Sequence, residues 1–311
     1  MQLLIPYAYV DDPGCTQALA TLHLPVLDPL LARLTVARTD TGSADTLTPP
    51  HERALAQAIG ITAADGLVPW AASAVARSGR DPGTNGWAWI TPAHWQVGAD
   101  RIQMTDPATL QLSHDASQTL LQAMAPYFAQ DGIELMPDTP GRWLARGDAL
   151  TTLATASLDR VIDADVGPWM PATASMRRLQ NEMQMLLYTH PVNDARSAQG
   201  LASVNSFWVS GSGAMAPNTP LTPVKPEPAV ADALRPAALR GDWTAWAEAW
   251  RQLDQGACQK LAGAIDRGQT CELVLCSERN AIHFTAAALG WRERLQRRLK
   301  RPSLKDFTAL L

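Results

Sequence analysis

The stretch whose residue types best suit chemistry is 190–213, HPVNDARSAQGLASVNSFWVSGSG. Arg196 is permanently charged, and glycines in the turn Ser210-Gly211-Ser212-Gly213 would let backbone N–H groups converge on an oxyanion, so the two together could cradle a small anion. A structural interpretation is also possible. Asn193 and Asn205 would then form hydrogen bonds with buried backbone groups, and Gly200 and Gly211 would occupy positions that need a positive φ. A glycine-rich turn alone is weak evidence for a ligand, and the structural interpretation is the commoner one.

Metal-binding patterns are not evident among the histidines and cysteines. The six histidines show no i, i+4 pair of the kind that holds a metal on a helix, and the four cysteines show no C-x-x-C spacing. In a chain of 311 residues such cysteines are expected to be reduced thiols of an intracellular protein. The N-terminus has no basic segment or cleavage site, so we expect a first strand there and not a signal peptide. No apolar run is long enough to span a bilayer.

Tryptophans recur at alternate positions around Trp87, Trp89 and Trp95, next to His94. Aromatic side chains on one face of a strand could stack on a base or on a partner protein. They are more often one face of a small sheet packed on its helix. Both interpretations remain open from the sequence.

The charge of the chain is uneven. From Trp291 to the C-terminus seven basic residues stand against Glu293 and Asp306, which gives +5 in a chain of net charge −4. Such a segment can bind nucleic acid or another anionic partner. It is also typical of a solvated final helix, since Trp291, Leu295 and Leu299 recur at helical spacing. The residues predicted for contact with a partner are Arg294, Arg297, Arg298, Lys300 and Arg301.

Alternating strand and helix patterns predict an α/β protein, with a mainly parallel sheet and helices on both faces. The first strand precedes Asp11, and helices are expected at 25–38, 48–60, 69–78, 173–188 and 242–253; CELVLC, 271–276, is a buried strand. We expect a loop at 190–200. Between 85 and 148 the pattern becomes strand, strand, helix, strand, strand, which predicts a small inserted α+β domain in a core formed by 1–84 and 149–311.

The motif region resembles the archaeal-type, cofactor-independent phosphoglycerate mutases of the alkaline phosphatase superfamily. Those proteins carry a loop H-P-x-N-x-x-R, a glycine shortly after it, and a strand and turn A-N-x-x-W-x-x-G-x-G. The matching residues occur here in the same order: His190, Pro191, Asn193, Arg196, Gly200, Asn205, Trp208, Gly211 and Gly213. Weaker matches, at TPPHERALAQAIG and LVLCSERNA, extend the resemblance over most of the chain. It implies an alkaline-phosphatase-like core with an inserted lid.

The same resemblance implies phosphoryl transfer through a serine and two divalent metal ions held by Asp and His. Leu67 and Val68 stand where the serine would be expected, and no histidine lies within 229–253, where the family has its ligand set. The family's D-H pair is replaced by Ser277 and Glu278, and its lid arginine motifs are replaced at 94–96 and 106–110.

These losses predict a non-catalytic, mutase-like scaffold in the cytoplasm. It would need no cofactor and would bind an unknown protein partner or small anionic ligand, through His190, Asn193, Arg196, Asn205, Ser210, Gly211 and Gly213. The first alternative is a mutase or phosphatase that binds Mn²⁺ or Zn²⁺ at a rebuilt site: Asp11, Asp12, Asp254 and Glu278. The second alternative is a nucleic-acid-associated protein that uses the basic terminal segment.

Overall fold

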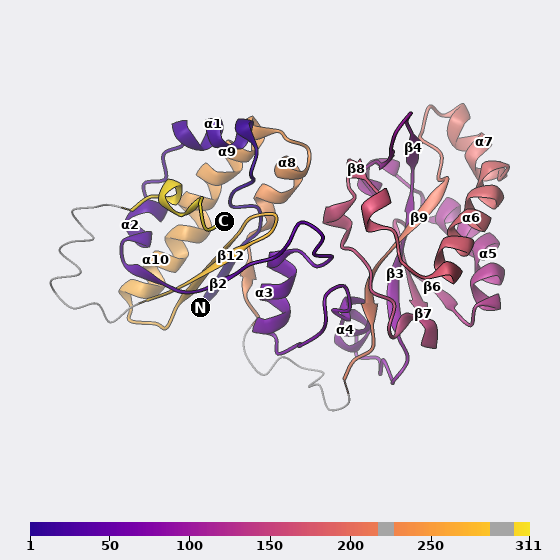
Figure 1. Ribbon diagram of the computed structural model, residues 1–311, viewed down its shortest axis with the longest axis horizontal. Coiled ribbons are helices and arrows are strands. Elements are labelled where there is room, and N and C mark those ends of the chain that lie inside the picture. Colours follow the sequence, from indigo (N-terminus) through magenta and orange to yellow (C-terminus); the bar gives the residue numbers. More distant parts are fainter. Residues whose placement is uncertain (217–226, 287–301) are drawn as a thin grey trace. The chain divides into compact units, whose positions relative to one another are not determined.

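The computed structural model describes residues 1–216, 227–286 and 302–311. Within them the chain forms two compact units, each with its own core (Figure 1). The first unit comprises Met1–Ala44, Pro49–Gly60 and Pro223–Leu311, and the second comprises Asp45–Thr48 and Ile61–Thr222. The second unit therefore extends well beyond the range 85–148 that the sequence predicted for an inserted domain. Among the described residues, no helix has the length and apolar character needed to cross a bilayer.

The first unit is built on a five-stranded sheet in the order β10-β1-β11-β12-β2. Its strands are β1 (Gln2–Ile5), β2 (Leu34–Asp40), β10 (Ala229–Val230), β11 (Glu272–Cys276) and β12 (Ala281–Ala286). Its α-helices are α1 (Pro13–Thr21), α2 (Leu27–Leu31), α3 (Pro50–Ala58), α8 (Arg235–Leu239), α9 (Trp243–Leu253) and α10 (Gln259–Asp266). A π-helical turn, Asp254–Cys258, joins α9 to α10, and single 3-10 turns occupy Asp232–Leu234 and Leu304–Phe307.

The α/β class is confirmed, but the sheet is mixed where we expected it to be mainly parallel. β1 is parallel to β10 and β11, whereas β12 is antiparallel to β11 and to β2. The reason is the short link 277–280 between β11 and β12, since a parallel pair needs a crossover of a dozen or more residues. The prediction of a helix over 25–38 was also wrong. The helix there spans only Leu27–Leu31, and the chain then forms strand β2, which pairs with β12.

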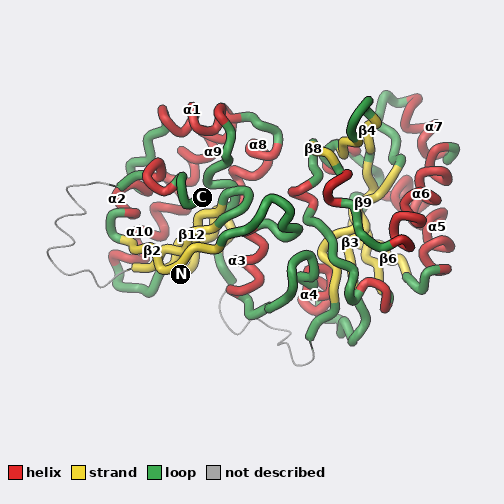
Figure 2. Tube along the Cα trace, in the orientation of Figure 1, coloured by secondary structure: helices red, strands yellow, loops and turns green. Residues whose placement is uncertain are grey.

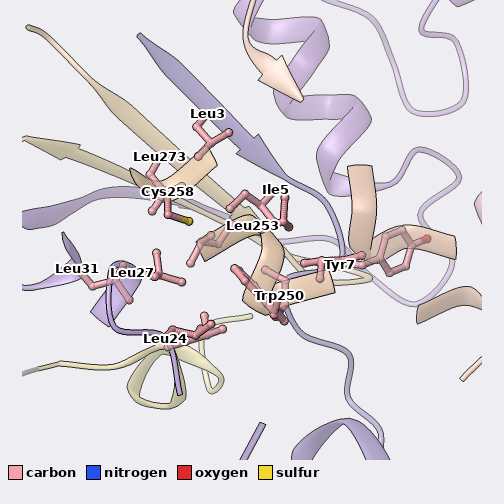
Figure 3. Close-up of a cluster of buried hydrophobic side chains, with 14 of the residues drawn as sticks. Leu3, Ile5, Tyr7, Leu24, Leu27, Leu31, Trp250, Leu253, Cys258 and Leu273 are labelled. Carbon is pink, nitrogen blue, oxygen red and sulfur yellow. The ribbon is translucent and has the colours of Figure 1, made fainter. Parts of the chain in front are cut away.

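Apolar side chains alternate across this sheet and fill a layer on each face. Leu3, Ile5 and Leu273 belong to a large cluster with residues of α1, α2, α9 and α10, part of which is drawn in Figure 3. Leu4 and Val274 point to the other face, where Ala54 of α3 covers them. The sheet is therefore buried between helices, as a strand of almost continuous apolar residues requires.

The second unit contains a four-stranded antiparallel sheet in the order β6-β7-β3-β9 and a small sheet in the order β4-β5-β8. The strands are β3 (Trp87–Ala93), β4 (Trp95–Val97), β5 (Ile102–Met104), β6 (Glu134–Thr139), β7 (Arg142–Arg146), β8 (Ala164–Asp165) and β9 (Ser206–Gly213). The helices are α4 (Trp70–Arg77), α5 (His114–Gln130), α6 (Ala174–Tyr188) and α7 (Pro191–Ala198). Short 3-10 turns lie at Pro107–Leu110, Asp148–Leu150, Leu158–Arg160 and Gly167–Trp169.

The larger sheet of the second unit has one face under α5 and α6 and part of the other face under α4 (Figure 2). Ala88 and Ile90 of β3 pack with α5 and α6. Trp87 points the opposite way and packs with α4, because side chains alternate along a strand. One face of β3 is thus committed to the core, and the other carries tryptophans.

Candidate functional site

The carboxyl end of β1 is the place where the family resemblance would put a catalytic centre. Beyond Ile5 the chain turns through Tyr7, a buried residue held at φ 55°. A non-glycine residue at positive φ is strained and persists only where its surroundings hold it. The carbonyl of Tyr7 accepts a hydrogen bond from Nε1 of Trp246 at 2.9 Å, and the carbonyl of Ala8 accepts one from Nε1 of Trp250 at 3.3 Å.

Helix α9 supplies these two indoles from one face. Trp246 and Trp250 are four residues apart, so they stack along the helix, and both are fully buried. Their ring centroids lie 6.2 Å apart in an edge-to-face arrangement, and Figure 3 shows Trp250 in the same cluster as Ile5 and Tyr7. The segment 229–253, where the resemblance would place Asp and His ligands, therefore packs large apolar rings against the end of β1.

Asp12 begins helix α1. Its Oδ1 accepts the backbone N–H of Gly14 at 2.7 Å and that of Cys15 at 3.2 Å, which satisfies two amides that the helix cannot bond itself. Asp11 precedes it and is exposed. Both acids thus follow β1 as the sequence predicted, and Asp12 has a structural role as an N-cap.

Glu278 follows β11, whose carboxyl end is adjacent to that of β1. The charge of Glu278 acts on the thiol of Cys15. Burial raises the pKa of this thiol to about 11, and the negative charges of Asp12 and Glu278 add to that increase. Two of the predicted carboxylates are therefore near one buried thiol. With such a pKa Cys15 is almost entirely protonated at neutral pH, and a protonated thiol is a poor nucleophile.

Asp254 begins the π-helical turn after α9, and its carboxylate reaches the start of α2, elsewhere in the first unit. Its Oδ1 accepts the N–H of Leu27 at 2.7 Å and its Oδ2 accepts the N–H of Val26 at 3.1 Å, so each carboxylate oxygen is used by the backbone. Within residues 1–216, 227–286 and 302–311, no group of three or more His, Cys, Asp or Glu side chains is arranged to hold a metal ion.

In the second unit, Asn193 and Arg196 of the motif are buried and bonded to the backbone. The Asn193 amide donates to the carbonyls of Leu187 and Val204 and accepts the N–H of Val204, each at 2.8 Å. Arg196 donates to the carbonyl of Ala202 at 2.8 Å and to that of Leu110 at 2.5 Å. Burial lowers the pKa of the guanidinium.

His190 and Asn205 of the motif are also bonded to nearby backbone groups. Nδ1 of His190 accepts the N–H of Val192 at 3.2 Å and caps α7, and a proline follows at the first helical position. The expected loop at 190–200 is therefore largely a helix, because a capping side chain and a proline at this position favour helix initiation. The Asn205 amide bonds to the N–H and to the carbonyl of Trp95, at 2.7 and 2.8 Å.

The expected glycine-rich turn at 210–213 is the last part of strand β9. The hydroxyl of Ser212 bonds to the hydroxyl of Thr155 at 2.8 Å and also to the carbonyl of Leu153. Gly211 has φ 62°, and a Cβ placed on it would lie 2.9 Å from Cε3 of Trp89. Positive φ and this close approach both require glycine there. The binding role of residues 190–213 remains a prediction, and the contacts described here brace the second unit.

The tryptophan cluster is divided between two environments. Trp95 packs on Trp208 with ring centroids 6.4 Å apart, and His94 bonds to the carbonyl of Ser203 through Nδ1 at 2.8 Å. Trp89 is half-buried and lies beneath the guanidinium of Arg142, 4.6 Å from the ring centroid. Arg142 was not among the residues predicted from the sequence; its place in RWLAR, in a strand that pairs with WAWIT, is the signal that could have indicated it. The predicted contact residues Arg294, Arg297, Arg298, Lys300 and Arg301 lie outside the described residues.

Comparison with known proteins gives distant structural likeness only. No protein-family model and no curated protein sequence matches the chain. A cofactor-independent phosphoglycerate mutase from Thermoplasma acidophilum is similar in structure, with 13% identity and a TM-score of 0.39 over 93% of this chain and 90% of that one. The PH0037 protein from Pyrococcus horikoshii gives 12% identity and a TM-score of 0.40 over 95% and 91%. At these scores no residue role follows from either likeness.

Proposed function

We propose that the chain is a non-catalytic, mutase-like scaffold that binds a protein partner or a small anion in a regulatory or accessory role. The observation that carries the proposal is the pair of hydrogen bonds from Trp246 and Trp250 to the carbonyls of Tyr7 and Ala8. Metal-assisted phosphoryl transfer needs charged ligands and an open coordination site at this position. Buried indoles that bond to the backbone fill it with apolar surface instead.

The engagement of the remaining polar groups supports the same proposal. Asp12 caps α1, Asp254 caps α2, and Asn193 and Arg196 bond to backbone carbonyls. Each of these side chains would have to leave a buried or partly buried backbone partner in order to take a catalytic role, and an unpaired group there is costly. Leu67 and Val68 have no group that could carry a phosphoryl.

A metal-dependent phosphatase or mutase is the second candidate, because Asp12 and Glu278 both lie close enough to Cys15 to raise its pKa. Two carboxylates at the adjacent ends of β1 and β11 could hold a divalent ion with help from Asp11. Such a site would contain oxygen ligands without histidine, which suits Mg²⁺ or Mn²⁺ better than Zn²⁺.

Metal binding distinguishes the two candidates. We expect the purified full-length protein to contain no stoichiometric metal by elemental analysis, and its melting temperature to stay unchanged when Mn²⁺, Mg²⁺ or Zn²⁺ is added. The matched variant is Asp12→Asn, because asparagine can still cap α1 but is a weaker metal ligand. A metal-induced rise in melting temperature that Asp12→Asn or Glu278→Gln abolishes would favour the enzyme and contradict the scaffold.

A further inference from the structure

Two tryptophan–arginine pairs lie on the same face of the second unit's larger sheet. The guanidinium of Arg146 lies 5.9 Å from the ring centroid of Trp87, and that of Arg142 lies 4.6 Å from the ring centroid of Trp89. Members of each pair come from the adjacent strands β3 and β7, in which Trp87 faces Arg146 in register. Each arginine is also ion-paired, Arg146 with Glu134 at 2.7 Å and Arg142 with Asp138 at 2.8 Å.

The two pairs differ in how their indole nitrogens are satisfied. Nε1 of Trp87 donates to the carbonyl of Pro82 at 2.8 Å. Nε1 of Trp89 is buried and has no hydrogen-bond partner within the described part of the chain, and the same is true of Oγ1 of Thr91. Buried polar atoms are nearly always bonded, so two orphaned atoms two residues apart on one strand indicate a group that the protein itself does not supply.

Trp89, Thr91 and Arg142 lie on the same face of this sheet. Trp89 pairs with Leu144 of β7; Thr91 is two residues after Trp89 and Arg142 two residues before Leu144, so all of these side chains lie on one face of the sheet. The Cε3 and Cζ3 edge of the Trp89 ring lies against Gly211 of β9. The guanidinium of Arg142 lies over the same ring, 4.6 Å from its centroid.

Trp89, Thr91 and Arg142 are all hydrogen-bond donors. An indole N–H can only donate, a guanidinium can only donate, and a threonine hydroxyl can do so. Arg142 uses Nε for Asp138 and has a side-chain exposure of 40%. Its terminal nitrogens form no other hydrogen bond among the residues that the structure describes. Donors of this kind beside a partly exposed cation suit a negatively charged acceptor.

We propose that Trp89, Thr91 and Arg142 form a binding site for a small oxyanion, a phosphate or a carboxylate. The inference rests on the anion-binding part of the proposed function and locates it away from residues 190–213. Because both orphaned atoms are buried, binding requires the side chains that cover them to move, and the Arg142 guanidinium above the Trp89 ring would move with the anion. Its contacts with Trp89 and Asp138 are partly exposed and weak enough to exchange.

Titration of the full-length protein with inorganic phosphate tests the site, with the indole N–H signal of Trp89 followed by NMR and assigned from Trp89→Phe. We expect this signal to shift on saturation. Arg142→Gln and the isosteric Thr91→Val should each weaken phosphate binding by at least about tenfold, the ratio that the loss of a charge-assisted hydrogen bond gives. Asp138→Asn should strengthen it, because a repelling carboxylate is removed. Acetate in place of phosphate distinguishes a carboxylate site from a phosphate site.

Arg146→Gln is the matched control, since Arg146 occupies the same face over a tryptophan whose nitrogen is already bonded. It should leave phosphate affinity within about twofold of the wild type, as a more distant charge does. If neither anion shifts the Trp89 signal, the orphaned atoms hold only water and the inference fails. If phosphate binds and Arg142→Gln has no effect, the site is elsewhere, which overturns this inference and leaves the proposed function intact.

Discussion

Asn193 and Arg196 are polar residues of a kind that suits ligand binding, but their side chains form hydrogen bonds with the backbone. The chain changes direction between α7 and β9, and the carbonyls of Val204 and Ala202 there have no partner in a helix or sheet ladder. Buried carbonyls and amides must be bonded, and an asparagine offers both a donor and an acceptor. At this scale the motif positions the second unit's helices against its sheet.

Replacement of Asn193 should therefore destabilise the protein. Asn193→Ala leaves the buried carbonyl and N–H of Val204 without a partner, and we expect it to lower the free energy of unfolding by about 3 kcal/mol. Ser197→Ala, on the exposed side of the same helix, should change it by less than about 0.5 kcal/mol. Urea denaturation measures both, and equal effects from the two variants would contradict a bracing role for Asn193.

Asp28 gives a prediction for pH. Burial raises its pKa, and the charge of Asp254 adds to the increase. A raised carboxyl pKa means that the folded state favours the protonated form, so the stability that this group contributes is complete below its unfolded pKa and is lost as pH rises through the folded value. Asparagine keeps an oxygen for the N–H of Leu304.

Asp28→Asn should accordingly be more stable than the wild type at pH 7, and the two should converge below about pH 4, where the aspartate of the wild type is protonated in both states. Denaturant titrations at several pH values measure the difference. A variant that is less stable than the wild type at pH 7 would show that the Asp28 charge is favourable.

Among the elements, α9 determines which side chains surround the carboxyl end of β1. Its three tryptophans look alike in sequence, but Trp246 and Trp250 are buried and bonded to β1, whereas Trp243 is half-buried. A bond from an indole to a carbonyl beside the strained Tyr7 fixes the path of the loop that leads to Asp12. The helix thus forms a hydrogen-bonded apolar wall beside this loop.

Trp246→Phe keeps an aromatic ring but removes the donor to Tyr7, and should lower the free energy of unfolding by about 2 kcal/mol, through the orphaned carbonyl and the lost volume. Trp243→Phe is the comparison on the same helix and should cost less than about 1 kcal/mol, because its side chain is half-buried. Thermal and urea denaturation report both values. A larger loss at Trp243 would contradict the assigned role of Trp246.

Elements with strong local signals could be predicted from the sequence, and those fixed by distant partners could not. The helices now labelled α3, α4, α6 and α9 lie where capping and periodicity placed them. Strand β2 was taken for the end of a helix because its assignment depends on pairing with β12, more than two hundred residues away. The orphaned nitrogen of Trp89 could not be predicted, since nothing in the local sequence shows that Nε1 of Trp87 has a carbonyl within reach and that of Trp89 has none.

Over the whole molecule, each of two compact units contains its own hydrophobic core. Separate cores favour separate cooperative transitions. The small inserted domain expected from the sequence covers only part of the second unit, because segments before and after it, including α4 and α6, pack on the same sheet. Pattern changes along a chain mark strands and helices, but they do not show which segments share a core.

We therefore expect hydrogen exchange followed by mass spectrometry to show two cooperative openings. Asn193→Ala should accelerate exchange in residues 61–216 and Trp246→Phe in residues 1–44 and 227–286, each leaving the other unit unchanged, because a core mutation acts on the unit that contains it. If either variant accelerates exchange equally in both units, the chain unfolds as one cooperative body.

The central claim, that this molecule is a scaffold without phosphoryl-transfer activity, is tested most directly by turnover. The assay uses the full-length protein with 3-phosphoglycerate and with a simple phosphate monoester, in the presence of Mn²⁺, Mg²⁺ or Zn²⁺, beside Asp12→Asn and Glu278→Gln. We predict that the wild type shows no turnover above either variant. Metal-dependent turnover by the wild type that Asp12→Asn abolishes would contradict the account and place the chemistry at the ends of β1 and β11.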